Sequence, residues 1–92
     1  MTFEWDGNNL RKIRAHRIKR EEAEQALLND PIPVYEQDVE GDLRFVYYGE
    51  TSAGRLLAVI VTERRNNLRV VTAYDLDAAQ RHDYLRLRME GQ

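Results

Sequence analysis

The feature that most constrains this chain is a pair of apolar runs in its second half. Residues 56–62 are apolar at odd and even positions alike, which is typical of a central strand covered on both faces, although a buried helix fits the same pattern. Residues 68–74 form the second run, and Asn66-Asn67 stands between the two. Asparagine tolerates the positive φ of a tight turn, so this segment predicts a β-hairpin at the centre of a sheet.

Weaker patterns predict the elements around this hairpin. Strands are predicted at residues 3–5, 34–36 and 43–48, and helices at residues 8–17 and 20–28 and from about 77 to 89. Lys19 is a poor cap for the helix at 20–28, and the last helix, capped by Asp75 or Asp77, is expected to turn Ala78, Tyr84 and Leu85 inward. The order βααββββα predicts an α+β fold, a largely antiparallel meander with flanking helices.

Size and composition limit the classes of protein to which the chain can belong. Its 92 residues, 42% hydrophobic and 33% charged, predict one globular domain over residues 1–92. Zero cysteines exclude disulfides and a thiolate nucleophile. No apolar run approaches the roughly 20 residues of a membrane-spanning helix, and no signal peptide is recognisable, so we expect a cytoplasmic protein.

Charge is strongly segregated along the chain. The net charge of -2 disfavours a polyanion as ligand, yet the basic residues gather in one block. Six basic residues and no acid lie within residues 10–20, namely Arg11, Lys12, Arg14, Arg17, Lys19 and Arg20. The next segment, residues 21–42, has eight acids and no Lys or Arg, and residues 43–92 are mildly basic. Such segregation permits a basic face on an acidic molecule, although the block also fits a solvated helix face.

Several kinds of chemistry are disfavoured by missing motifs. The chain has no glycine-rich phosphate loop, and its two histidines, His16 and His82, have no partners at metal-ligand spacing. Ser52, the only serine, lies in a predicted turn without a histidine nearby. We therefore expect no metal site and no cofactor.

Arginines on the predicted strands are the best candidates for a functional site. They are Arg44, Arg55, Arg64, Arg65 and Arg69. Guanidinium groups bind phosphate through two parallel hydrogen bonds and stabilise its developing charge. Alternatively, these arginines are exposed strand residues paired with Glu50 or Glu63. Tyr47, Tyr48 and Tyr74 fit either base stacking or ordinary packing in a small sheet.

Short motifs over nearly the whole chain resemble the BrnT family of ribonuclease toxins from bacterial type II toxin–antitoxin operons. The matching segments are Phe3-Glu4-Trp5-Asp6, residues 9–16, Glu21-Glu22-Ala23, Asp30-Pro31, Arg44-Phe45-Val46 with Gly49, Gly54-Arg55-Leu56-Leu57, Thr62-Glu63-Arg64, residues 68–73, and Arg81 with Tyr84. No single motif is specific, but their order and spacing together are.

The resemblance implies a RelE-like fold and metal-independent RNA cleavage, in which the ribose 2′-hydroxyl attacks the adjacent phosphate. It implies the catalytic candidates Glu63, Arg64, Arg69 and Tyr74, and the RNA-binding candidates Arg11, Lys12, His16 and Arg44. Arg64 and Arg69 would stabilise the phosphate, and Glu63 would be a base or orient an arginine. The implied partners are RNA and a ribbon-helix-helix antitoxin, in a homodimer or a toxin–antitoxin hetero-oligomer.

Two departures from the family pattern keep other functions open. Ala15-His16-Arg17 stands where the family commonly has Lys-His-Gly, and Tyr74-Asp75 stands in place of two arginines, with Tyr74 a candidate for proton transfer or stacking. One alternative is therefore a degenerate, non-catalytic protein that binds an antitoxin-like partner, and another is an RNA-binding module without catalysis.

Strand alternation places Arg69 and Val71 on one face of the predicted strand, and Val70 and Thr72 on the other. It leaves undetermined whether Arg64 shares a face with Arg69.

Overall fold

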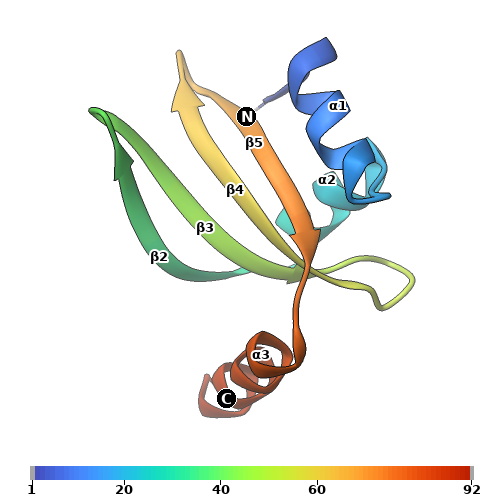
Figure 1. The fold of residues 1–92 in the computed structure, drawn as a ribbon. Helices are drawn as coiled ribbons and strands as arrows, with labels where there is room; N and C mark the ends of the chain where they lie inside the picture. The colour runs from blue at the N-terminus through green and yellow to red at the C-terminus, as the bar shows by residue number, and fades with distance from the viewer. Residues whose placement is uncertain (1, 92) are drawn as a thin grey trace.

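Five strands form one sheet in the order β1-β5-β4-β3-β2 (Figure 1). The structure is a computed structural model that describes residues 2–91. The strands are β1 (Thr2–Glu4), β2 (Ile32–Val39), β3 (Asp42–Glu50), β4 (Leu56–Arg64) and β5 (Asn67–Asp75). Strands β2 to β5 pair antiparallel in chain order, and β1 pairs with β5 in parallel. The predicted α+β fold and its order βααββββα are therefore confirmed.

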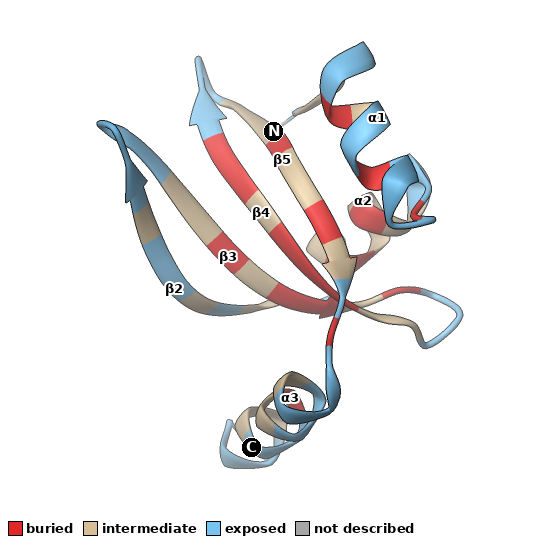
Figure 2. Cartoon of the chain, in the orientation of Figure 1, coloured by how far each residue is buried: buried red, intermediate tan, exposed pale blue. Residues whose placement is uncertain are grey.

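The helices lie on both faces of this sheet. They are α1 (Gly7–Ala15), α2 (Arg20–Leu28) and α3 (Ala78–Glu90). Ile13 of α1 and Ala26 of α2 pack with Val59 of β4 in one core cluster, whereas Tyr84 of α3 packs with Ala58 in a second cluster. Neighbouring residues of β4 thus serve opposite cores, and Figure 2 shows β4 buried along most of its length. This confirms the predicted central strand.

A β-bulge interrupts the pairing of β4 with β5. Ile60 pairs with Thr72 and Val61 with Val70, so Val71 has no partner on β4. Because Val71 is unpaired, each later residue of β5 points to the face opposite to the one that strict alternation along the strand would give it. The expectation that Val70 and Thr72 share a face is therefore wrong.

Two other sequence expectations are corrected by the structure. Strand β2 extends over Ile32–Val39 rather than residues 34–36, because β3 pairs with it along its length. In α3 only Tyr84 is buried, as expected, while Leu85 is 57% exposed and Ala78 is also exposed. Leu85 and Ala78 lie on the solvent side because α3 meets the sheet through a narrow stripe around Tyr84.

The weak start of α2 agrees with its sequence. The Lys19 side chain makes no capping hydrogen bond, and the carboxylate of Glu22 instead accepts from the Lys19 backbone N–H at 2.9 Å.

Within residues 2–91, none of the helices has the length and apolarity needed to cross a membrane.

Replacing Gly49 with alanine should destabilise the fold. Gly49 is buried on β3, and a Cβ there would overlap the backbone carbonyl of Ala26 in α2. We expect Gly49→Ala to lower the free energy of unfolding by about 1–3 kcal/mol, measured by urea denaturation, because strand and helix must separate. Gly7→Ala is the matched control: a Cβ at Gly7 meets no atom within 4 Å. Equal stability of the two variants would contradict the close approach of β3 and α2.

Candidate functional site

Four basic side chains from four different elements line one hollow of about 170 Å³. They are Lys12 of α1, Arg44 of β3, Arg64 of β4 and Arg69 of β5, and the other lining residues are Asn8, Asn9, Asp42, Thr62 and Val71. Thr62 faces Arg69 across the β4–β5 ladder. Strand alternation alone did not show whether Arg64 and Arg69 share a face of the sheet. The structure shows that both line the same hollow.

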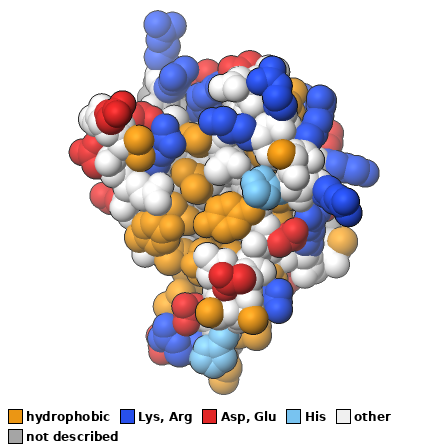
Figure 3. All heavy atoms as spheres, viewed as in Figure 1, with side chains coloured by type: hydrophobic (Ala, Val, Ile, Leu, Met, Phe, Trp, Pro, Cys, Tyr) orange, Lys and Arg blue, Asp and Glu red, His pale blue; other side chains and the backbone are white. Residues whose placement is uncertain are grey.

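The hollow opens on the sheet face that α3 partly covers. Val61 packs in the core beneath α1 and α2, so the next residue, Thr62, points to the opposite face. In Figure 3, hydrophobic side chains fill the middle of the molecule, and Lys and Arg side chains gather above and to the right. The net charge of -2 therefore conceals a local concentration of cations.

Carboxylates accompany three of these four cations. Nη1 of Arg69 lies 2.8 Å from Oδ2 of Asp6 and 3.5 Å from Oε1 of Glu4. Nη1 of Arg64 lies 3.7 Å from the same Glu4 oxygen, and Nε of Arg44 lies 3.1 Å from Asp42. Among residues 2–91, Lys12 makes no ion pair. An incoming anion must therefore compete with the protein's own carboxylates.

Arg69 is the most enclosed of these ion-paired cations. Its side chain is 12% exposed, against 61% for Arg64. Although Nη1 is close to Asp6, its N–H groups are poorly aligned, so within the described chain this buried nitrogen has no well-formed hydrogen bond. A poorly satisfied buried donor costs free energy, which favours exchange of the long Glu4 contact for a better acceptor.

The start of α1 is fixed by a reciprocal pair, Asp6 and Asn9. The Asp6 carboxylate caps α1 by accepting from the backbone N–H groups of Asn8 and Asn9, and the Asn9 amide oxygen accepts from the Asp6 N–H at 2.8 Å. The Asn9 amide nitrogen donates to the carbonyls of Glu4 and Val70. Asn9 therefore ties α1 to β1 and β5, and this anchor brings Lys12, one helical turn later, to the hollow.

A second group of candidates lies farther along β5. The rings of His16 and Tyr74 are 6.2 Å apart between centroids and tilted by 50°. Burial raises the pKa of the Tyr74 hydroxyl above its ordinary value, so this hydroxyl keeps its proton at neutral pH. Tyr74 comes five positions after Arg69 on β5, which is roughly 15 Å at the rise of a β-strand. His16 and Tyr74 therefore lie outside the arginine hollow.

Besides His16 and Tyr74, two further predicted site residues are not brought to the hollow. Glu63 pairs with Leu68, which packs against the core beneath α1 and α2, so Glu63 lies on the face opposite Thr62 and Arg64. Arg11 is exposed on α1 and does not line the hollow. Of the other tyrosines, Tyr47 packs against the first core cluster and Tyr48 is buried in the second, so both are packing residues.

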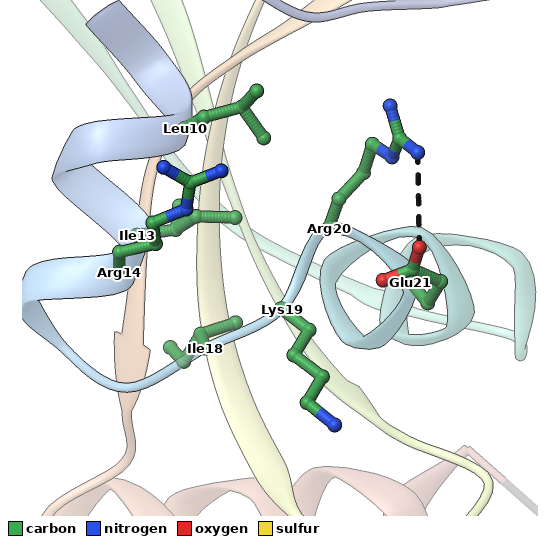
Figure 4. A pocket seen from close by; sticks show the side chains of 7 residues that line it. All are labelled: Leu10, Ile13, Arg14, Ile18, Lys19, Arg20 and Glu21. Carbon is green, nitrogen blue, oxygen red and sulfur yellow. Dashed lines mark ion pairs between the residues drawn. The ribbon is translucent and has the colours of Figure 1, made fainter. Parts of the chain in front are cut away.

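The rest of the basic block forms a different surface. Arg14, Lys19 and Arg20 line a groove of about 270 Å³ between α1 and α2. Figure 4 shows these side chains together with the apolar Ile13 and Ile18, which also line the groove. Arg20 pairs with Glu21 at 3.8 Å. Within the basic block, Arg14, Lys19 and Arg20 therefore line a different surface from Lys12.

The acidic and amide side of the hollow is absent from the residues that the sequence predicts for the site. Asp6 and Asn9 occur among the family motifs, but no pattern assigns them to the site. An Asp followed three residues later by an Asn is a capping pattern, and it would have located the start of α1. Nothing in the local sequence pairs Asp6 with Arg69, since the two are distant in the chain.

Among the described residues, no group of three or more His, Asp or Glu side chains is arranged to hold a metal ion.

The Asp6–Arg69 pair predicts a specific loss of stability in acid. The Arg69 guanidinium lowers the pKa of Asp6 from 3.8 to about 2, and the backbone N–H of Asn9 adds to this effect. The Asp6 carboxyl therefore binds a proton less tightly in the folded state than in the unfolded chain. The stability that comes from this difference in pKa is lost as pH falls from about 4 to about 2. Asp6→Asn retains a capping oxygen without the charge, so its thermal midpoint should fall less steeply over that range.

Asp77→Asn is the matched control for this experiment. Asp77 caps α3 by accepting from the Gln80 N–H at 2.8 Å, and no arginine pairs with it among residues 2–91. Its pH dependence should match that of the unsubstituted chain. A slope for Asp6→Asn identical to that of Asp77→Asn would show that Arg69 does not hold the Asp6 charge.

One known protein family matches most of the chain. A family model described as the ribonuclease toxin BrnT of a type II toxin–antitoxin system matches residues 5–80, which include all four cations of the hollow. No curated protein matches the chain with significance. The matched region runs from the end of β1 into the first turn of α3 and so contains most of the fold. The chain therefore belongs to the BrnT family of ribonuclease toxins of type II toxin–antitoxin systems.

Proposed function

We propose that the chain is an active, metal-independent endoribonuclease whose scissile phosphate binds in the hollow between α1 and the β3–β5 strands. The observation that carries the proposal is the convergence of Lys12, Arg44, Arg64 and Arg69 from four separate elements. Arginine and lysine gathered on one concave surface neutralise phosphate charge and orient the phosphate for reaction. Membership of the family supplies the substrate class, RNA, and an antitoxin as partner.

In the proposed reaction the ribose 2′-hydroxyl attacks the adjacent phosphorus. The bond from phosphorus to the 5′-oxygen of the next nucleotide breaks, which leaves a 2′,3′-cyclic phosphate and a 5′-hydroxyl. Solvent water accepts the 2′-hydroxyl proton, and a proton from solvent water passes to the leaving 5′-oxygen. Arg64 and Arg69 stabilise the additional charge on the phosphate oxygens, which is the main source of rate in this site.

The Arg69 ion pairs suit this role because they differ in strength. Glu4 lies 3.5 Å from Arg69 and 3.7 Å from Arg64, so a phosphate oxygen can displace it from both guanidiniums. Asp6, at 2.8 Å, remains as the group that orients Arg69. Glu63 has no place in this mechanism, since it lies on the other face of the sheet.

His16 and Tyr74 are proposed to hold the neighbouring nucleotide. Their separation from Arg69, roughly 15 Å along β5, is too large for proton transfer at a phosphate in the hollow. Tyr74 also keeps its proton at neutral pH, because burial raises its pKa. A half-buried tyrosine beside an imidazole is instead a stacking platform for a base, which contributes about 1–3 kcal/mol of binding free energy.

A second candidate function is a non-catalytic subunit that binds an antitoxin. One observation favours it: Arg44, Arg64 and Arg69 each lie within 4 Å of a carboxylate of the chain itself. In either function we propose a ribbon-helix-helix antitoxin as the partner, in a toxin–antitoxin hetero-oligomer. The acidic β2–β3 hairpin, with Glu36, Asp38 and Glu40 exposed, offers a basic partner a complementary surface.

Removing Arg69 should abolish most of the RNA cleavage. We expect Arg69→Ala to lower kcat by about 100-fold or more, the usual effect of deleting a group that stabilises transition-state charge. Purified protein and a labelled RNA in EDTA give the rates, and end-group analysis identifies the cyclic phosphate. Arg14→Ala is the matched control, because Arg14 lines the α1–α2 groove rather than the hollow, and it should keep the full rate.

Three results would contradict this proposal. Intact RNA together with a stable toxin–antitoxin complex would support the non-catalytic candidate function instead. Cleavage that EDTA abolishes would remove the metal-independent mechanism. Equal losses in Arg14→Ala and Arg69→Ala would show that only the overall positive charge matters, rather than the geometry of the hollow.

A further inference from the structure

Arg55, a residue to which the proposed mechanism gives no role, has the densest polar contacts of any side chain among residues 2–91. Its Nε and Nη2 atoms donate to the two oxygens of Asp75 at 2.6 and 2.9 Å, a bidentate pair. Its Nη1 donates to the Glu22 carboxylate at 3.2 and 3.3 Å. Its side chain is 27% exposed, so these contacts are partly shielded from water. Asp75 and Glu22 raise the pKa of Arg55 above its ordinary value, so the guanidinium stays charged.

The same guanidinium also binds the loop between α1 and α2. Nη1 donates to the carbonyl of Arg17 at 2.9 Å, and Nη2 to the carbonyl of His16 at 3.4 Å. Arg17 has a φ of 58°, in the left-handed region that non-glycine residues rarely adopt. An arginine that satisfies carbonyls just past a helix end stabilises such a turn. Arg55 therefore holds the loop in a conformation that its own sequence does not favour.

These contacts involve the residues that follow His16 and Tyr74, the two residues of the proposed stacking platform. Asp75 follows Tyr74 on β5, and Arg17 follows His16 in the loop. One rigid guanidinium thus links the Asp75 carboxylate on one side of the His16–Tyr74 ring pair to the loop backbone on the other. The contact also neutralises Asp75, which is the acid that replaces a family arginine, so Asp75 does not act as an unpaired negative charge beside bound RNA.

We propose that Arg55 is a positioning residue that holds the His16 ring against Tyr74 and so sets the affinity for the nucleotide next to the scissile phosphate. This inference rests on the proposed function for its kinetic consequence, but its structural consequence stands without RNA. Arg55 touches neither the hollow nor the platform rings, so its loss acts on nucleotide binding and leaves the chemistry at Arg69 unchanged.

The test compares Arg55→Gln with Arg88→Gln. Arg88 is a close match: its side chain is also 27% exposed, and it links α3 to the loop after α2 through Asp30 at 3.1 Å. We expect Arg55→Gln to raise KM for RNA about tenfold, comparable with the loss of one stacked base in Tyr74→Ala, with kcat within about twofold. Arg88→Gln should leave both constants unchanged.

A second readout needs no RNA. Proton NMR should show nuclear Overhauser contacts between the His16 and Tyr74 rings in the unsubstituted chain and in Arg88→Gln, and their loss in Arg55→Gln. Arg55→Lys, which keeps the charge without the planar fork, is the second variant if Arg55→Gln does not fold, and it should lose the same ring contact.

The outcomes separate this inference from the proposed function. A chain that cleaves no RNA but loses the ring contact only in the Arg55 variants supports the positioning role and refutes the ribonuclease proposal. Ring contacts that persist in Arg55→Gln or Arg55→Lys overturn the positioning role, whatever the activity. A lost contact with unchanged KM, or an effect on kcat alone, overturns the link between the platform and nucleotide affinity.

Discussion

The contact between Asp6 and Arg69 is the interaction on which the rest of this structure depends. Asp6 caps α1 through two backbone N–H groups and pairs with Arg69 of β5 at 2.8 Å. A single carboxylate therefore starts the helix that supplies Lys12 and fixes the most enclosed arginine of the hollow. Asn9, which bonds to β1 and β5, completes this junction. Because the fold and the proposed site share these residues, a change at Asp6 should act on stability and on the proposed phosphate binding together.

Charge balance in the hollow explains how a mildly acidic chain can hold the proposed phosphate site. Arg44, Arg64 and Arg69 line the same hollow, and each of them also lies close to a carboxylate of the chain. The arginines therefore gather on one surface and form ion pairs at the same time. Their contacts with carboxylates range from 2.8 to 3.7 Å. In the proposed function a phosphate oxygen displaces the long Glu4 contacts, whereas the short ion pair with Asp6 keeps Arg69 in place. Lys12, with no ion pair among the described residues, is immediately available to an anion.

Sequence patterns predicted what depends on local periodicity and missed what depends on distant contacts. The β4–β5 hairpin was predictable because an apolar run, an asparagine turn and a returning run follow one another. This hairpin carries Arg64 and Arg69, two of the arginines of the hollow. The bulge at Val71 has no glycine to mark it, and it moved Thr72 to the other face. Glu4 and Asp6 reach Arg69 only because β1 pairs with β5 from the far end of the chain. The weak amphipathicity of α3 likewise hid that Leu85 faces solvent.

The most direct test of this account is to observe the arginine side chains while RNA binds. Nitrogen-15 NMR resolves guanidinium Nε–Hε signals, and an RNA with one 2′-deoxy nucleotide at the cleavage site binds without reacting. The account predicts that the signals of Arg44, Arg64 and Arg69 shift with a common affinity, while those of Arg14 and Arg20 do not. Shifts confined to Arg14 and Arg20, with the three hollow arginines unchanged, would contradict it, because RNA would then bind the α1–α2 groove and leave the ion pairs of the hollow intact.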